Sequence, residues 1–332
     1  MPPEASDQLP SSPATIRRAA LRAFKWTLLA VVLWFVGRSL LNNLRQVDFN
    51  AVRFAPLPLV GSLLSILTIY LMQLLSYRFL LGSYVRLLPW RVMMAVAWVP
   101  LLGKYVPGKV AAIAAAVFLL RRFGVGGGVA LSVVLVLDGL AVLAGLVIGA
   151  RLLLLPGFGD RIPGGMMLYL VVVVVGLVCV HPAIYSRLVD RALKLLGRSP
   201  LPKRPTLRDY GLPALTAILQ WVFSGTGLWL MSRSLTPVPL GDWPMFVSVA
   251  ALAMTVSYLA LFAPGGIGVR EGIFMLGLQP LVGGGNAAIV VVAMRVLHIV
   301  IELALSGVGA LCLRSLSLPA SASGLLQSAD RR

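Results

Sequence analysis

Long apolar runs alternate with short polar segments along most of the chain. A helix that crosses the hydrocarbon core of a bilayer needs about 20 mainly apolar residues, and shorter runs can still cross a thinner region. Six runs are predicted to cross as helices: Trp26–Leu41, Leu57–Tyr77, Val129–Leu155, Met166–Val180, Gly211–Met231 and Ala287–Leu313. This pattern predicts an all-α integral membrane protein.

A seventh apolar region is interrupted in its middle. As helices, Val92–Gly103 and Val110–Leu120 would extend about 18 and 16 Å, well short of a core about 30 Å thick. Polar and helix-breaking residues at membrane depth are tolerated where they line a cavity. The region therefore predicts a re-entrant helical hairpin, with a tip that contains Lys104, Pro107, Gly108 and Lys109.

An eighth region, Met245–Phe262 followed by Ile267–Pro280, is broken in a similar way. An aromatic residue again precedes a Pro-Gly pair, here within Pro264, Gly265 and Gly266. The incoming arm would be about 27 Å long, so its length leaves open whether it crosses fully or forms the arm of a second re-entrant hairpin.

The distribution of Lys and Arg suggests an orientation in the membrane. These residues accumulate in short cytoplasmic loops, and most of the 29 in this chain fall on one side if the amino terminus is cytoplasmic and both broken segments return. The chain then has a tail at 1–25, one membrane domain at 26–314 with a basic cytoplasmic linker helix in 183–210, and a polar tail at 315–332. Units 26–155 and 166–314 read as inverted repeats, as in many carriers.

Composition agrees with an integral membrane protein, because 59% of the residues are hydrophobic and only 12% are charged. We expect it in the cell (inner or cytoplasmic) membrane. The formal net charge of +18 fits cytoplasmic loops better than nucleic acid, which we do not expect as a partner. Cys179 and Cys312 both lie in apolar runs, so they indicate neither a disulfide framework nor a metal site. We expect no cofactor.

Seven ionisable residues are predicted to lie at membrane depth, where each costs about 2.5–3.5 kcal/mol at the centre of a helix. They are Lys104, Lys109, Asp138, Arg270, Glu271, Arg295 and Glu302. Such residues usually face one another or water. Four cations against three anions suggest a polar cavity that accepts an anionic group.

The spacing of these residues suggests their roles. Arg295, His298 and Glu302 share one helix face, and a helix that starts at each Pro-Gly break could present its N–H groups to a phosphate. The predicted substrate-binding residues are Lys104, Pro107, Gly108, Lys109, Pro264, Gly265, Gly266, Arg270 and Arg295. Charge balance, or a proton or amine site, is assigned to Asp138, Glu271, His298 and Glu302. Simple kinks at the Pro-Gly pairs and a purely structural ion pair are the alternatives.

Two segments resemble the signature segments of a known family. KYVPGKVAAIAAAVFLLRRFGV (104–125) and APGGIGVREGIFMLGL (263–278) are similar to those of the lysylphosphatidylglycerol synthase transmembrane-domain, or flippase-like, family, and the resemblance extends over about Leu28–Leu313. It implies translocation of a phospholipid. Synthase activity is not expected, because in fused relatives a separate soluble domain supplies it.

The leading hypothesis is therefore a flippase-like lipid transporter that binds an anionic phospholipid or polyprenyl-linked lipid between the two hairpins. A secondary carrier of a small anion would use the same repeats and cations. A non-transporting membrane subunit that docks a partner enzyme through 183–210, and a homo-oligomer, are further possibilities. An enzyme is not expected, because no nucleophile, metal set or cofactor motif accompanies Glu302 and His298.

Overall fold

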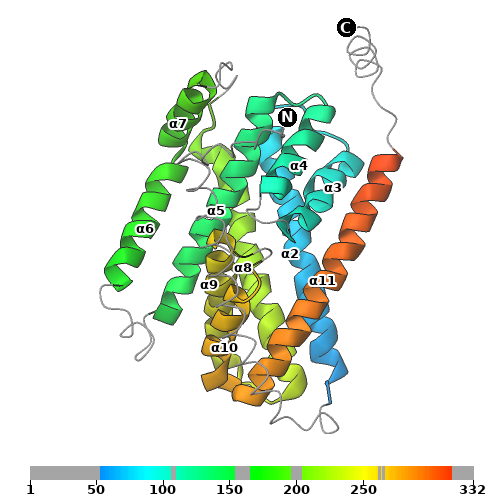
Figure 1. Ribbon diagram of the computed structural model, residues 1–332, viewed down its shortest axis with the longest axis vertical. Helices are drawn as coiled ribbons and strands as arrows, with labels where there is room; N and C mark the ends of the chain where they lie inside the picture. Colours follow the sequence, from blue (N-terminus) through cyan, green and yellow to red (C-terminus); the bar gives the residue numbers. More distant parts are fainter. Residues whose placement is uncertain are drawn as a thin grey trace, which may run out of the picture.

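The computed structural model describes residues 53–105, 110–153, 165–195, 204–260, 263 and 266–315. Within these ranges every regular element is a helix, as Figure 1 shows. The elements are α2 (Pro56–Gly82), α3 (Trp90–Trp98), the 3-10 helix η1 (Val99–Tyr105), α4 (Val110–Arg122), α5 (Gly127–Leu153), α6 (Gly165–Val180), α7 (Pro182–Leu195), α8 (Leu207–Leu235), the 3-10 helix η3 (Leu240–Asp242), α9 (Trp243–Leu259), α10 (Val269–Val282) and α11 (Gly284–Arg314).

Four long helices, α2, α5, α8 and α11, have 27 to 31 residues each. Each is long and apolar enough to cross a membrane, and together they confirm four of the predicted crossings. A helix satisfies every backbone N–H and C=O within its own segment except at its ends, which lipid requires. The predicted first crossing, Trp26–Leu41, and the two predicted tails except Ser315 lie outside the described residues.

The first broken region has helices on both sides of its break, as predicted, but its incoming arm changes from α-helix to 3-10 helix at Val99. Helix α3 and η1 lead toward the middle of the molecule and α4 returns to the same end (Figure 1). Gly103 allows this close return, because a Cβ at that position would lie 2.7 Å from the backbone nitrogen of Ala112 on α4. The predicted tip, residues 106–109, lies outside the described part of the chain.

The second broken region approaches from the opposite end of the molecule (Figure 1). Helix α9, counted together with η3 as Leu240–Leu259, is long enough to cross. It nevertheless packs against α10, and α10 returns to the end where α9 begins and where α11 starts. The inverted repeat that the sequence suggests stays a prediction.

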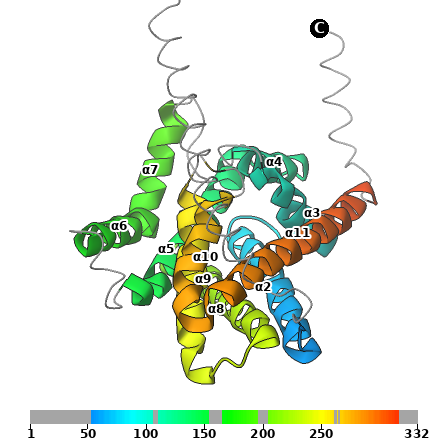
Figure 2. The ribbon, with the colours of Figure 1, turned by 60° about the horizontal axis from the view of Figure 1, so that its bottom comes forward.

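Helices α6 and α7 lie at the edge of the bundle, where α6 packs on α5 (Figures 1 and 2). With 16 residues, α6 would extend about 24 Å. It counts as a crossing only when it is combined with α7, which bends away from it by 74°. Helix α7 lies within the range predicted to be the basic linker, and Arg187 and Arg191 are exposed on it.

The following helix begins earlier than the sequence pattern suggests. Helix α8 starts at Leu207, inside the range predicted to be linker. A capping box explains this start: the backbone N–H of Thr206 donates to Asp209 Oδ2 at 2.7 Å, and the Thr206 side chain accepts the backbone N–H of Asp209 in return. These bonds satisfy N–H groups that the first helical turn would otherwise leave without partners.

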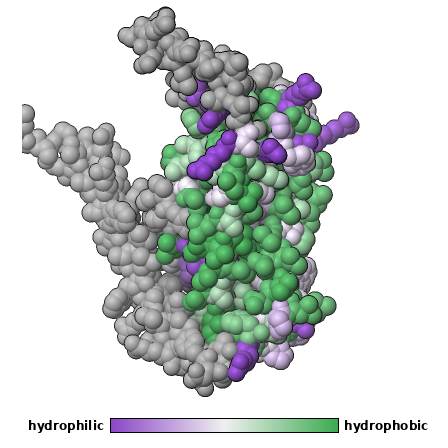
Figure 3. All heavy atoms as spheres, turned by 90° about the vertical axis from the view of Figure 1, so that its right-hand side faces the viewer, coloured by the Kyte–Doolittle hydropathy of each residue, from purple (hydrophilic) through white to green (hydrophobic). Residues whose placement is uncertain are grey.

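Close packing in the bundle depends on small residues. Ser62 on α2 donates to the carbonyl of Gly227 on α8 at 2.8 Å, and a Cβ at Gly225 would lie 2.2 Å from Cα of Val247 on α9. Apolar side chains remain on the outside, including Val296, Val300 and Leu303 of α11. Figure 3 shows this apolar band between polar side chains at the two ends. The protein is a multi-pass membrane protein.

Candidate functional site

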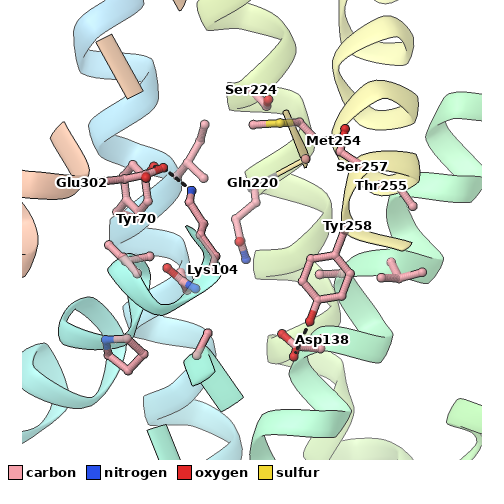
Figure 4. A pocket seen from close by; sticks show the side chains of 18 of the residues that line it. Tyr70, Lys104, Asp138, Gln220, Ser224, Met254, Thr255, Ser257, Tyr258 and Glu302 are labelled. Atoms are coloured by element: carbon pink, nitrogen blue, oxygen red, sulfur yellow. Dashed lines mark hydrogen bonds and ion pairs between the residues drawn. The ribbon is translucent and has the colours of Figure 1, made fainter. Parts of the chain in front are cut away.

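A cavity of about 280 Å³ lies where the two broken regions and the long helices meet. The side chains that line it come from α2, α3, η1, α4, α5, α8, α9, α10 and α11, together with Gly266. Figure 4 shows two polar groups facing each other across it, one around Glu302 and one around Asp138. The cavity thus collects polar side chains in an otherwise apolar chain.

The first polar group joins three elements at Glu302 of α11. Its carboxylate is 1% exposed and accepts hydrogen bonds from Tyr70 Oη of α2 at 2.6 Å and from Lys104 Nζ of η1 (Figure 4). Lys104 and Glu302 therefore form an ion pair. The pair ties the first broken region to the last helix inside the membrane.

Neighbouring bonds fix the elements that carry this ion pair. Ser306 of α11 donates to the carbonyl of Trp98 at 2.9 Å, and the indole N–H of Trp98 donates to the carbonyl of Tyr70 at 3.4 Å. Helices α2, α3 and α11 are thus linked directly beside Glu302.

His298 lies one turn before Glu302 on α11 and also lines the cavity. It is 4% exposed, and its Nδ1 lies 2.8 Å from the carbonyl oxygen of Met294. A carbonyl can only accept, so Nδ1 carries the hydrogen and Nε2 keeps its lone pair. Among the described residues, Nε2 has no hydrogen-bond partner.

A second cationic group surrounds Glu271 at the start of α10. Its Oε1 lies 3.3 Å from Arg270 and 3.3 Å from Arg295 of α11. Its Oε2 accepts the N–H of Gly268 at 2.7 Å. Arg270 also lines the cavity, whereas Glu271 and Arg295 are outside its lining. One carboxylate thus holds two guanidinium groups together and caps its own helix.

This cap places the start of α10 differently from the prediction. The helix begins at Val269 after Gly268, not at the Pro-Gly pair. The backbone N–H of Gly268 donates to the carboxylate of Glu271. Arg270 and Glu271 therefore belong to the first turn of the helix. The carboxylate stabilises this helix end where a phosphate was expected.

The opposite wall carries Asp138 of α5, whose Oδ2 accepts a hydrogen bond from Tyr258 of α9 at 2.6 Å (Figure 4). Gln220 of α8 lies between the two walls (Figure 4). Its amide N–H₂ is 3.4 Å from Ser76 Oγ. The cavity therefore offers an acidic group on one side and cationic groups on the other.

Gly266 closes the cavity beside α9. Its φ of +69° is a left-handed backbone conformation that favours glycine. A Cβ at this position would also lie 2.6 Å from Cβ of Ser257. Of the predicted Pro-Gly-Gly segment, Gly266 is the residue that the structure describes.

The structure thus brings many of the predicted residues to one place. Those that line the cavity are Lys104, Asp138, Gly266, Arg270, His298 and Glu302, with Glu271 and Arg295 behind Arg270. The remaining predicted residues, Pro107, Gly108, Lys109, Pro264 and Gly265, lie outside the described part of the chain.

Sequence reasoning missed the uncharged polar residues of the lining. They include Tyr70, Gln73, Tyr77, Gln220, Ser224 and Tyr258. A signal existed on α2, because Tyr70, Gln73 and Tyr77 recur at the spacing of one helix face within an apolar run. Among the described residues, no group of three or more His, Cys, Asp or Glu could hold a metal ion.

Comparison with protein families matches residues 22–306 to the family described as "Lysylphosphatidylglycerol synthase TM region". The match covers both broken regions and the helices that enclose the cavity, and it agrees with the resemblance noted in the sequence. No curated protein sequence matches the chain.

Proposed function

Because the chain belongs to the lysylphosphatidylglycerol synthase transmembrane-region family, we propose that it is a lipid translocase. It binds the anionic headgroup of a phospholipid or a polyprenyl-linked lipid in the cavity and moves it across the bilayer, while the acyl or prenyl chains stay in the hydrocarbon. The family takes its name from the membrane part of an enzyme that makes a phospholipid, which fits this substrate class.

One observation carries the proposal: cations from both broken regions line the same cavity. Lys104 comes from η1 and Arg270 from the first turn of α10, and both line it. Cations at membrane depth usually mark a substrate pathway, and an Arg binds a phosphate through charge-assisted hydrogen bonds. Lys104 and Arg270 are the phosphate partners in this proposal, and Arg295 supports Arg270 through Glu271.

In the structure each of these cations already contacts a carboxylate. Lys104 is paired with Glu302, and Arg270 with Glu271. A phosphate that binds these cations must compete with their carboxylates. Competition also limits affinity, which suits a transporter that must release its substrate.

The apolar part of the lining favours a lipid over a small soluble anion. Leu101, Ile113 and Val142 line the same cavity as the charged groups. A headgroup that carries its glycerol backbone and first methylenes would place these carbons against the apolar side chains. A fully hydrated anion would gain nothing from them.

The orientation in the proposed function follows from the basic residues. The linker carries exposed Arg187 and Arg191, and such basic residues accumulate on the cytoplasmic side of a membrane. In the proposed orientation the chain therefore lies in the cytoplasmic membrane with the linker and both termini inside. The first broken region then opens toward the cytoplasm and the second toward the opposite side.

Reconstitution tests the function. Purified protein is incorporated into phosphatidylcholine vesicles that contain a fluorescent phosphatidylglycerol or a labelled polyprenyl phosphate, and a membrane-impermeant quencher reports exchange between leaflets. We expect exchange well above that of empty vesicles. Exchange at the rate of empty vesicles for every lipid would overturn the proposal, and uptake of inorganic phosphate in its place would favour the small-anion carrier.

Matched variants locate the activity. Arg270→Gln removes a charge-assisted phosphate contact worth about 1.5–3 kcal/mol, so exchange at limiting lipid should fall about 10- to 100-fold. Arg151→Gln removes the same charge from an exposed site at the end of α5 and should leave exchange unchanged. Size-exclusion chromatography of each variant verifies that it folds.

A further inference from the structure

Glu302 and the proposed phosphate compete for one ammonium group. The carboxylate is 1% exposed and pairs with Lys104, whose side chain is 31% exposed toward the cavity. A lipid phosphate that binds Lys104 therefore places a second negative charge beside Glu302. Removing one partner from a buried ion pair leaves an uncompensated charge away from water, which is strongly unfavourable.

Protonation of Glu302 avoids this cost. A neutral carboxylic acid needs no cation, and its carbonyl oxygen can keep the hydrogen bond that Tyr70 now donates at 2.6 Å. Its new O–H can donate to the incoming phosphate. Binding of the anion and uptake of one proton thus favour each other.

His298 provides a route for the proton. Its Nε2 is buried, lines the cavity and has no hydrogen-bond partner among the described residues, while Nδ1 is held by the carbonyl of Met294. A bare imidazole nitrogen accepts a proton from cavity water and passes it on. Since Glu302 is one turn away on the same face of α11, His298 is placed to relay it.

Charged and titratable groups from three neighbouring elements face these two residues. Tyr70 faces them from α2, Lys104 from η1 and Arg270 from α10. In this arrangement His298 serves as the relay and not as the final site of the proton. The carboxylate of Glu302 is the group that can keep the proton.

From this geometry we infer that the protein cotransports protons with its lipid, and this inference rests on the proposed function. One proton moves from water on the loading side, through His298 Nε2, to a carboxylate oxygen of Glu302 as the phosphate displaces it from Lys104. On the other side the lipid leaves, Glu302 loses the proton to water, and the Lys104–Glu302 pair re-forms. A singly charged phosphodiester and one proton cross together without net charge.

The steady-state distribution of lipid between leaflets tests this coupling. Proteoliposomes of phosphatidylcholine with a small fraction of fluorescent phosphatidylglycerol are given a stable difference of one pH unit across the membrane. Cotransport of one proton per lipid should concentrate the fluorescent lipid about tenfold in the leaflet facing the alkaline side. Without a pH difference the two leaflets should fill equally.

The outcomes separate the coupling from the proposed function. Exchange that stays equal between the leaflets under the pH difference would overturn proton coupling and leave the translocase intact. An absence of any exchange would overturn both. A pH-sensitive dye trapped in the vesicles gives an independent readout, because lipid entry should acidify the interior.

Three variants assign the coupling to residues. Glu302→Gln should make the fluorescent lipid distribute equally between the leaflets under the pH difference, whatever exchange rate remains. If Glu302 has a purely structural role, the variant should instead change the exchange rate and keep the tenfold ratio. His298→Asn should slow the approach to the final ratio without changing it. The matched control is Asp242→Asn, which removes a carboxylate next to α9 and outside the cavity lining. It should keep both the exchange rate and the tenfold ratio between the leaflets.

Discussion

Replacing Lys104 by Met should destabilise the protein because it isolates a buried carboxylate. The ammonium of Lys104 pairs with Glu302, which is 1% exposed, while Lys104 itself is 31% exposed. Breaking a fully buried pair costs about 3–5 kcal/mol. Partial access of water to Lys104 places the expected loss near the lower end, at about 3 kcal/mol.

A double-mutant cycle isolates the contribution of the pair. Glu302→Gln has nearly the same shape as the native residue and keeps an oxygen that accepts the hydrogen bond from Tyr70. In the Lys104→Met background this second change should therefore restore part of the stability, with a coupling energy of about 2 kcal/mol between the two sites. The free energy of unfolding can be measured in mixed detergent micelles by circular dichroism.

Additive effects would refute this reasoning. If the cost of the double variant equals the sum of the single costs, the ion pair does not stabilise the fold and the carboxylate is satisfied by other means. Loss of the same 3 kcal/mol in the Arg151→Gln control would point to a general effect of lost positive charge, since Arg151 is exposed at the end of α5.

Two further changes test the geometry around the cavity. Gly266→Ala should lower the free energy of unfolding by about 1–3 kcal/mol, because φ is +69° and the new Cβ would meet Ser257. Gly307→Ala, where nothing lies within 4 Å, should leave the free energy of unfolding unchanged or raise it by up to about 1 kcal/mol. Equal melting temperatures of the two variants would contradict this. Tyr258→Phe removes the donor that bonds to Asp138 at 2.6 Å and should cost about 1–3 kcal/mol in the same unfolding measurement. An unchanged unfolding free energy would show that water replaces the hydroxyl.

The long helices could be predicted from the sequence because lipid permits few alternatives. An apolar run must satisfy its backbone internally, so α5 and α11 end within two or three residues of the predicted limits. The return of α4 could be predicted for the same reason, since its run is too short to cross. The start of α8 could not, because it depends on two particular side chains, Thr206 and Asp209.

The charged residues of the site could be predicted from the sequence, but the ion pairs that they form could not. A charge at membrane depth is costly wherever it lies, so Arg270 and Glu302 could be identified by residue type alone. Their partners depend on how deeply each broken region reaches. The sequence did not indicate that Lys104 would meet Glu302, or that Glu271 would bind two arginines. Gln220 is uncharged and gave no signal, in contrast to Tyr70, Gln73 and Tyr77, whose spacing marks one face of α2.

The 3-10 helix η1 makes the length of the first broken region adjustable. Its seven residues advance about 2.0 Å each, against 1.5 Å in an α-helix, so winding it into continuous α-helix would shorten the segment by roughly 3.5 Å. Such a change would unwind the segment by about 0.4 turn and withdraw Lys104 from its place beside α11 while α3 stays where it is. Spin labels at exposed Leu102 and Leu311 would record the displacement as a change in their separation.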